Sequence, residues 1–354
     1  MESDPRVPSS DSRLFCRLAD IAGQLDPAKT LLVSDARIHA LYGNHFPGLP
    51  YALIPEGEAA KSMDALAALL DSFIRHKVDR SWSVLALGGG SISDTAGFAA
   101  HIWMRGIGFC AAPTTLLALC DAALGGKNSL DFGGYKNVIG SFHFPQRLFC
   151  DVETLRSLEP VQFASGMAEA IKHGILDGED HFAFLEDYAR RYGGEKGLDY
   201  SNCPAEALER IVFLSQQVKL GIVAQDPRES DTRRLLNLGH SFGHALELAG
   251  GMPHGYAVSL GIALASSYAR SKGRMSESDL QRILRLLARC GLPVSLAAVD
   301  SDGSLRMKAA ELLFMDKKRV GDLVHFILPE RIGTVKIEKI PVEELLSFLL
   351  KDGA

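Results

Sequence analysis

The stretch that decides the fold reads WSVLALGGGSISD and covers residues 82–94. Residues 82–87 are an apolar run, typical of a strand buried in a parallel sheet. A glycine run follows at 88–90, and we expect a helix through residues 96–104. In this order of strand, glycines and helix, a phosphate can approach the bare backbone at the helix N-terminus. The run is not the G-x-G-x-x-G fingerprint, so a dinucleotide pyrophosphate and a tight turn without a ligand both remain acceptable interpretations.

Further apolar runs on both sides extend this stretch into a sheet. Strands are predicted at residues 31–35, 51–55, 109–113 and 148–151, and a helix with apolar residues at helical spacing at 63–76. Over residues 1–28 we expect a polar lead-in followed by a short helix. Because strands alternate with helices, we expect a parallel α/β sheet of Rossmann-like type. The sequence thus predicts an N-terminal α/β domain over residues 1–158.

The chain changes character from about residue 160. Helical spacing predicts helices at residues 163–175, 205–224, 234–249, 257–271 and 277–290. Near the end, residues 324–329 and 333–337 predict a small hairpin, and 342–350 a last helix. We therefore expect a mostly α-helical C-terminal domain over residues 159–354. A cleft where the two halves meet is a usual place for a ligand.

The helical half carries a histidine pattern in residues 237–247, which read NLGHSFGHALE. His240 and His244 are four residues apart, so on a helix they share one face, the spacing that aims two imidazoles at one ion. His254 follows after a short break, and Glu169 lies upstream. Two or three imidazoles with one carboxylate are the donors of a catalytic zinc site. The alternative is that these are ordinary hydrogen-bonded histidines of the core or surface.

Composition excludes some classes of function. The chain has 354 residues, with 38 Lys and Arg against 43 Asp and Glu, a formal net charge of −5. This charge gives no support for nucleic-acid binding, which needs clustered positive charge. We expect no signal peptide and no membrane span, because no basic-then-apolar start and no long apolar run occur. The six cysteines are scattered without a C-x-x-C, which favours a reducing compartment and a cytoplasmic localisation.

Several motifs together resemble the dehydroquinate synthases, a family of sugar phosphate cyclases. They occur in the family's order from about residue 30 to the end, and each alone is weak. The motifs are PEGE (55–58) with Lys61, GGG (88–90) with Asp94, MRG (104–106), PTTLL (113–117) with Asp121, GGK (125–127), YKN (135–137), AE (168–169) with Lys172, residues 237–244, HG (254–255) and DKK (316–318).

The resemblance implies an activity. Such an enzyme uses NAD and one divalent metal, zinc or cobalt, to convert 3-deoxy-arabino-heptulosonate 7-phosphate into 3-dehydroquinate and phosphate. The steps are transient oxidation, phosphate elimination, re-reduction and aldol closure, so the enzyme is a phosphorus–oxygen lyase of the shikimate route. The first domain would then bind NAD, and the second would bind the metal and the small phosphorylated sugar-acid substrate.

The resemblance also implies roles for individual residues. The metal ligands would be Glu169, His240 and His254, which corrects the spacing argument and makes His244 a catalytic, substrate-side histidine. Positions on the NAD side are Asp35, Glu58, Lys61, Gly89, Gly90, Asp94, Thr114, Thr115 and Lys136. Asp121 and Lys127 match positions near both ligands. Positions on the substrate side are Asn137, Lys172, Lys219, Glu229, Arg233, Asn237 and one of Lys317 or Lys318. Arg105 matches an arginine that reaches the neighbouring subunit's phosphate, which implies a homodimer.

The chain departs from the family pattern in one loop. Family members usually have Gly-Gly-Lys-Thr and then an Asn-His pair, where this chain has Asn128 and then Asp131-Phe132. Two alternatives to this reaction are a sister cyclase making 2-deoxy-scyllo-inosose or a valiolone, and a metal-dependent alcohol or glycerol dehydrogenase. Taken singly, the lysines are ordinary surface charges and Glu169 is an i, i+3 helix partner of Lys172.

Overall fold

The computed structural model describes residues 12–194, 197–198, 203–314, 319–320 and 322–351. The chain divides into two compact units. The first, here called the sheet unit, is residues 1–158 with Lys219–Arg228. The second, the helical unit, is Glu159–Val218 with Glu229–Ala354. Among the described residues, no helix has both the length and the apolar character needed to cross a membrane.

The sheet unit is built on six parallel strands. Their order is β1 (Arg13–Phe15), β8 (Arg147–Cys150), β5 (Gly108–Pro113), β4 (Ser83–Gly88), β2 (Thr30–Ser34) and β3 (Tyr51–Leu53). Residues 84–88 of β4 are fully buried, as a central strand covered on both faces requires. The predicted parallel α/β sheet is confirmed.

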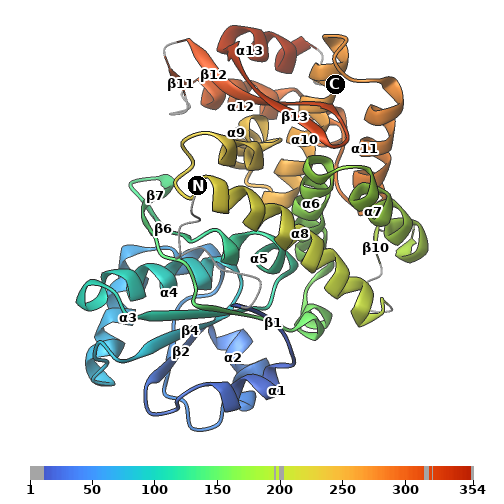
Figure 1. Cartoon of the computed structure of the whole chain (residues 1–354). Helices are drawn as coiled ribbons and strands as arrows, with labels where there is room; N and C mark the ends of the chain where they lie inside the picture. Colours follow the sequence, from blue (N-terminus) through green and yellow to red (C-terminus); the bar gives the residue numbers. More distant parts are fainter. Residues whose placement is uncertain (1–11, 195–196, 199–202, 315–318, 321, 352–354) are drawn as a thin grey trace. The chain divides into compact units, whose positions relative to one another are not determined.

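Helices cover this sheet on both sides, with α1 and α2 opposite α3 and α4 (Figure 1). Leu18 and Ile21 of α1 pack with Leu32, Leu85 and Phe149 of three strands in one apolar cluster. The elements are α1 (Leu18–Ile21), η2 (Ala22–Gln24), α2 (Ala36–Tyr42), η3 (Gly43–His45), η4 (Gly57–Ala60), α3 (Met63–Arg75), α4 (Gly90–Ile102), η5 (Trp103–Arg105), α5 (Leu116–Cys120), η6 (Ala122–Leu124) and η7 (Val152–Ser157).

Helices α2 and α5 and two β segments of the sheet unit were not predicted. Residues 13–15, within the expected lead-in, form the edge strand β1, which pairs with β8. A separate antiparallel hairpin, β6 (Lys127–Phe132) with β7 (Tyr135–Phe142), lies between α5 and β8. Most of β7 is exposed, so the hairpin lacks the apolar run that marks a buried strand. This hairpin holds the loop that departs from the family pattern.

The helical unit has helices around a small sheet. Its elements are α6 (Pro160–Asp177), α7 (Glu179–Tyr192), β9 (Gly193–Gly194), β10 (Gly197–Leu198), the first part of α8 (Ala205–Gln225), η9 (Thr232–Asn237), α9 (His240–Gly250), α10 (His254–Ser271), α11 (Glu277–Arg289), η10 (Leu296–Ala298), α12 (Ser304–Phe314), β11 (Arg319–Val320), β12 (Leu323–Arg331), β13 (Thr334–Pro341) and α13 (Val342–Lys351). From Lys219 on, α8 belongs to the sheet unit. The mostly helical character, the β12–β13 hairpin and the last helix agree with the prediction.

Two details of this unit differ from the prediction. The helix expected over residues 234–249 is broken, because Gly239 has a φ of 79° and α9 begins only at His240. The left-handed conformation of Gly239 cannot continue a helix. Helices α7 and α12 were also not predicted; α7 is amphipathic but strongly charged, with only Phe182, Leu185 and their neighbours on one face buried. The break at Gly239 places His240 at the start of a helix.

Candidate functional site

The helical unit brings three potential metal ligands together. Nε2 of His254 lies 3.2 Å from Oε1 of Glu169, and Nε2 of His240 lies 3.6 Å from the same oxygen. One ligand atom of each residue lies within 4.8 Å of the others. Two imidazoles and one carboxylate are the donors of zinc sites that keep one position open for substrate. The three residues therefore fit a single divalent metal.

Glycines allow the three helices to bring these ligands close. Glu169 lies inside α6, while His240 and His254 are the first residues of α9 and α10. A Cβ on Gly255 would lie 2.2 Å from Cα of Ser165 in α6, and a Cβ on Gly261 would lie 1.9 Å from the carbonyl oxygen of Gly239. Neither contact leaves room for a side chain, so only glycine lets these backbones touch. The close approach of the helices brings the three ligands together.

Hydrogen bonds fix which imidazole nitrogen faces Glu169. Nδ1 of His254 lies 2.9 Å from Oε2 of Glu247, and Nδ1 of His240 lies 3.1 Å from the carbonyl oxygen of Leu238. A ring nitrogen that donates outward leaves the other nitrogen for a metal, the usual arrangement around metal-binding histidines. Glu247 was not among the predicted site residues. Its place seven residues after His240 and three after His244 puts it on the same helix face, so helical spacing could have indicated it.

The surroundings shift the pKa values of His240 and His254 in opposite directions. Burial and the neighbouring ammonium of Lys172 hold the pKa of His240 well below its usual value, so His240 is neutral. Burial would also lower the pKa of His254, but hydrogen bonds to Glu169 and Glu247 outweigh it and raise the pKa to about 10. In the metal-free protein His254 is thus a cation between two carboxylates. A metal would take the place of its proton.

Two further predicted residues lie at this cluster. Lys172 forms an ion pair with Oε2 of Glu169, and both side chains are almost fully buried. The pair is an i, i+3 contact, but it lies in the interior and not on a helix surface. The ring centroid of His244 lies 5.0 Å from that of His240. His244 is outside the group whose ligand atoms converge on Glu169, which leaves its imidazole beside the ligands.

The segment before α9 carries three more predicted residues. Nδ2 of Asn237 donates to Oε1 of Glu229 at 2.6 Å. Glu229 has a φ of 60°, which is uncommon for a residue other than glycine. Arg233 is buried. The strained backbone and buried guanidinium of this segment are features that accumulate at functional sites.

In the sheet unit, the glycine turn leaves the start of α4 bare. Gly89 is the N-cap of α4. A Cβ on Gly89 would lie 3.2 Å from Cγ2 of Thr115, and a Cβ on Gly90 would lie 3.2 Å from Cβ of Ala122. Glycine therefore keeps these contacts unstrained, and it leaves the helix N-terminus approachable by an anion. The turn fits a phosphate of a dinucleotide.

A buried ion pair lies beside this turn. Nζ of Lys61 lies 2.7 Å from Oδ2 of Asp94 and also donates to Oδ1 of Asn137. The hydroxyl of Ser129 donates to Oδ1 of Asn137 at 2.7 Å. Burial raises the pKa of Asp94, and the Lys61 ammonium opposes that shift. Lys61 and Asp94, which were predicted on the NAD side, thus share one hydrogen-bond network with Asn137, which was predicted on the substrate side.

The remaining predicted residues of the sheet unit have these positions. Oδ1 of Asp35 caps α2 by accepting from the backbone N–H of Ile38, and Oγ1 of Thr115 caps α5 by accepting from that of Ala118. Thr114 is buried, Lys127 is exposed, and Glu58 pairs loosely with Lys136 at 3.8 Å. Lys219 pairs with Asp121 at 2.8 Å. Arg105 is exposed and has a φ of 69°. Lys317 and Lys318 lie outside the described residues.

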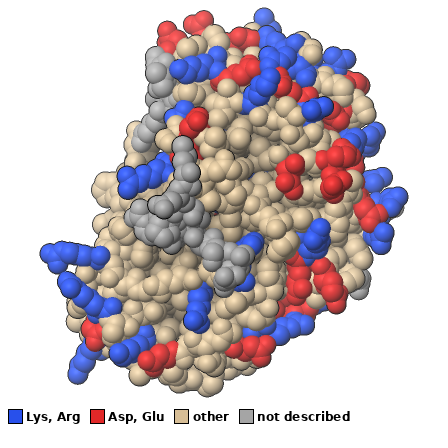
Figure 2. All heavy atoms as spheres, in the orientation of Figure 1, with Lys and Arg blue, Asp and Glu red and all other residues tan. Residues whose placement is uncertain are grey.

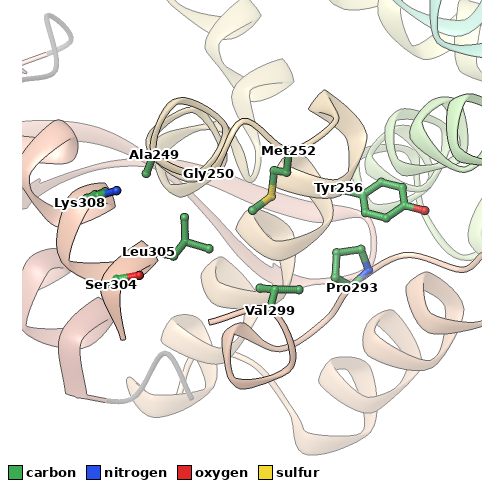
Figure 3. A pocket seen from close by; sticks show the side chains of 9 residues that line it. All are labelled: Ala249, Gly250, Met252, Tyr256, Pro293, Val299, Ser304, Leu305 and Lys308. Atoms are coloured by element: carbon green, nitrogen blue, oxygen red, sulfur yellow. The ribbon is translucent and has the colours of Figure 1, made fainter. Parts of the chain in front are cut away.

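A hollow of about 350 Å³ on the helical unit is separate from these residues. Its walls come from the end of α9, the start of α10 and the start of α12, and none of the predicted site residues lines it. Met252, Leu305 and Val299 face the open space (Figure 3). On the face shown in Figure 2, basic and acidic side chains are intermixed. The residues that line the hollow include no histidine, cysteine or carboxylate, so it offers no donor set for a metal.

Comparison with known proteins first gives the class. The structure matches that of 2-epi-5-epi-valiolone synthase from Streptomyces hygroscopicus subsp. jinggangensis 5008, which has NAD⁺ and Zn²⁺ bound. The TM-score is 0.83, the identity is 27%, and the match covers 99% of each chain. The fold is that of the sugar phosphate cyclases.

The particular family follows from the sequence. Residues 51–165 match the model for the 3-dehydroquinate synthase N-terminal region, and residues 166–319 match the C-terminal region. A 3-dehydroquinate synthase from Symbiobacterium thermophilum is 38% identical over 87% of this chain and 86% of its own length. Another, from Pelobacter propionicus, is 40% identical over 83% of this chain and 79% of its own length. The chain belongs to the 3-dehydroquinate synthase family.

Proposed function

We infer that the chain converts 3-deoxy-arabino-heptulosonate 7-phosphate into 3-dehydroquinate and phosphate, as a phosphorus–oxygen lyase of its family. The observation that carries this inference is the convergence of Glu169, His240 and His254 beside Lys172 and His244. Identity of 38–40% to 3-dehydroquinate synthases, against 27% to the valiolone synthase, favours this reaction over that of the sister cyclases.

Glu169, His240 and His254 would hold one divalent metal, zinc or cobalt. When bound, the metal supplies a Lewis acid that polarises a substrate oxygen. The chain's own contribution is the placement of the donors: Glu247 and the Leu238 carbonyl fix the two imidazoles. Lys172 keeps a positive charge next to Glu169 in a buried place, where it would attract an anionic substrate group.

The sheet unit would hold NAD. When bound, NAD supplies a hydride acceptor that returns the hydride within the same turnover. The bare turn at Gly89 and Gly90 would face a phosphate, and Asp94 and Lys61 would lie beside the cofactor. The further positions proposed for this unit are Asp35, Glu58, Thr114, Thr115, Asp121, Lys127 and Lys136.

The substrate carries a phosphate and a carboxylate, which suit lysine and arginine. We assign substrate binding to a set of charged and amide side chains. They are Lys127, Asn137, Lys172, Lys219, Glu229, Arg233 and Asn237. His244 would move a proton at an imidazole nitrogen, because imidazole titrates near neutral pH.

We assign Arg105 a role across the interface of a homodimer. Its side chain is exposed and its backbone is left-handed at the end of η5, which supports this role. The proposed compartment is the cytoplasm, which the six scattered cysteines, without a C-x-x-C, support.

The deciding experiment follows phosphate release and NADH absorbance together, with 3-deoxy-arabino-heptulosonate 7-phosphate, NAD and zinc or cobalt present. We expect phosphate without NADH accumulation. A chelator should abolish release, and His240→Ala should lower it by more than about 100-fold, beyond the usual effect of an outer-shell change. His76→Ala is the matched histidine control. NADH accumulation without phosphate would identify a dehydrogenase, and phosphate release from other sugar phosphates alone would identify a sister cyclase.

A further inference from the structure

The hairpin that departs from the family pattern closes a ring of hydrogen bonds. The backbone N–H of Asp131 donates to the carbonyl oxygen of Lys61 at 2.8 Å. Oδ1 of Asp131 accepts from the backbone N–H of Asn137 at 2.7 Å. Nζ of Lys61 then donates to Oδ1 of Asn137. The ring joins the segment before α3 to both strands of the β6–β7 hairpin through three residues.

Asn137 needs such support because its backbone is unusual. Its φ is 54°, in the left-handed region where side chains other than those of asparagine and aspartate are rarely found. Asp131 lies at a register shift between Leu130 and Phe132, which removes it from the regular pairing with β7. A β-bulge of this kind redirects a side chain. Here it brings the Asp131 carboxylate to the Asn137 amide.

The network also fixes which end of the Asn137 carboxamide faces outward. Its oxygen accepts from Lys61 and from the hydroxyl of Ser129. A carboxamide oxygen has two lone pairs, so both are in use, and the NH₂ group remains as donor. Within the described residues this NH₂ makes no hydrogen bond, and Asn137 is exposed. A ligand would therefore meet a donor at this position.

We propose that Ser129 and Asp131 are positioning residues that hold Asn137 as a hydrogen-bond donor to an oxygen of the substrate. The proposal rests on the proposed function for the identity of that substrate. It gives the departing loop a role: a side-chain oxygen of Asp131, which an asparagine at this position would also offer, completes the ring. The hairpin then selects a hydroxyl or carboxylate oxygen, and a substrate with a donor at that place is disfavoured.

The test is a set of double-mutant cycles. Ser129→Ala and Asp131→Ala should each lower kcat/KM by about 3- to 10-fold, the usual weight of one hydrogen bond, mainly through a higher KM. Asp131→Asn should restore most of this loss, because its amide oxygen accepts the same bond. In an Asn137→Ala background, Ser129→Ala should have no further effect. Ser141→Ala removes a hydroxyl of the same hairpin that has no hydrogen-bond partner, and it is the matched control.

Two outcomes would overturn the proposal while leaving the proposed function intact. One is a Ser129→Ala effect that is equal with and without Asn137. The other is an Asp131→Asn variant as impaired as Asp131→Ala. If the wild-type protein releases no phosphate, the proposed function fails, and hydrogen exchange of the Asn137 backbone amide becomes the readout. Asp131→Ala should then speed that exchange by about 10-fold, and an unchanged rate would count against the ring.

Discussion

The metal-ligand cluster of the helical unit and the Asn137 ring of the sheet unit place their side chains by different physical means. Glu169, His240 and His254 are held by helices whose backbones touch at glycines. Asn137 is held by side-chain hydrogen bonds in an exposed two-stranded hairpin. Packed backbone tolerates almost no added atom, whereas the exposed strand β7 that carries Asn137 has little packing to disturb. The first site should therefore fail through added bulk, and the second through lost hydrogen bonds.

The largest predicted effect comes from disturbing the backbone contact between α10 and α6 in the helical unit. Gly255→Ala would place a methyl group 2.2 Å from Cα of Ser165, so α10 must move away from α6. We expect a loss of at least about 3 kcal/mol of stability, the upper end for overpacking, and loss of metal binding. Thermal unfolding and zinc titration of the purified variant measure both.

The matched change in the sheet unit is Gly133→Ala in the β6–β7 turn. Gly133 has a φ of 59°, but a Cβ there would meet nothing within 4 Å. Only backbone strain of about 1–2 kcal/mol is expected, with metal binding unchanged. Equal damage from the two substitutions would contradict the distinction between backbone packing and hydrogen bonding.

A smaller effect tests how the ligands are oriented. Glu247→Gln keeps the shape of the side chain and removes the charge that faces Nδ1 of His254. We expect the affinity for zinc or cobalt to fall by about 10-fold, the lower end for an outer-shell carboxylate, with little change in thermal stability. Calorimetric titration of the metal-free protein measures this directly. Unchanged affinity would mean that Glu247 does not orient His254 for the metal.

The same contrast explains what the sequence could predict. Strands β2, β4 and β5 are continuous apolar runs, so composition alone indicated them. Strand β7 of the hairpin is mostly exposed, and the ring depends on contacts between residues 61, 131 and 137. Such contacts depend on register and on a bulge, which no local pattern encodes. The histidine pattern supplied the candidate metal donors and the resemblance to a family narrowed them to Glu169, His240 and His254, but neither argument used Glu247 or Ser129.

The smallest predicted effect concerns Asp300, a carboxylate that stabilises the helical unit and is not one of the metal ligands. Asp300 accepts hydrogen bonds from the backbone N–H groups of Leu305 and Arg306 at the start of α12, and from Nε of Arg306 at 2.9 Å. Burial would raise the pKa of Asp300, but these hydrogen bonds outweigh it and lower the pKa. Because the folded-state pKa is below the unfolded one, the stabilisation is present at neutral pH and is lost as pH falls through the folded value.

Asp300→Asn should therefore cost about 1 kcal/mol at pH 7, the usual weight of a helix cap. The difference from the wild-type protein should shrink below about pH 4, near the unfolded pKa of aspartate, and disappear at lower pH. Chemical unfolding at pH 7 and pH 3 measures this. Metal affinity should not change, in contrast to Glu247→Gln, because Asp300 faces a helix start and not a ligand. A fall in metal affinity with Asp300→Asn would show that the cluster depends on the general stability of its unit, and the separate role given to Glu247 would then be lost.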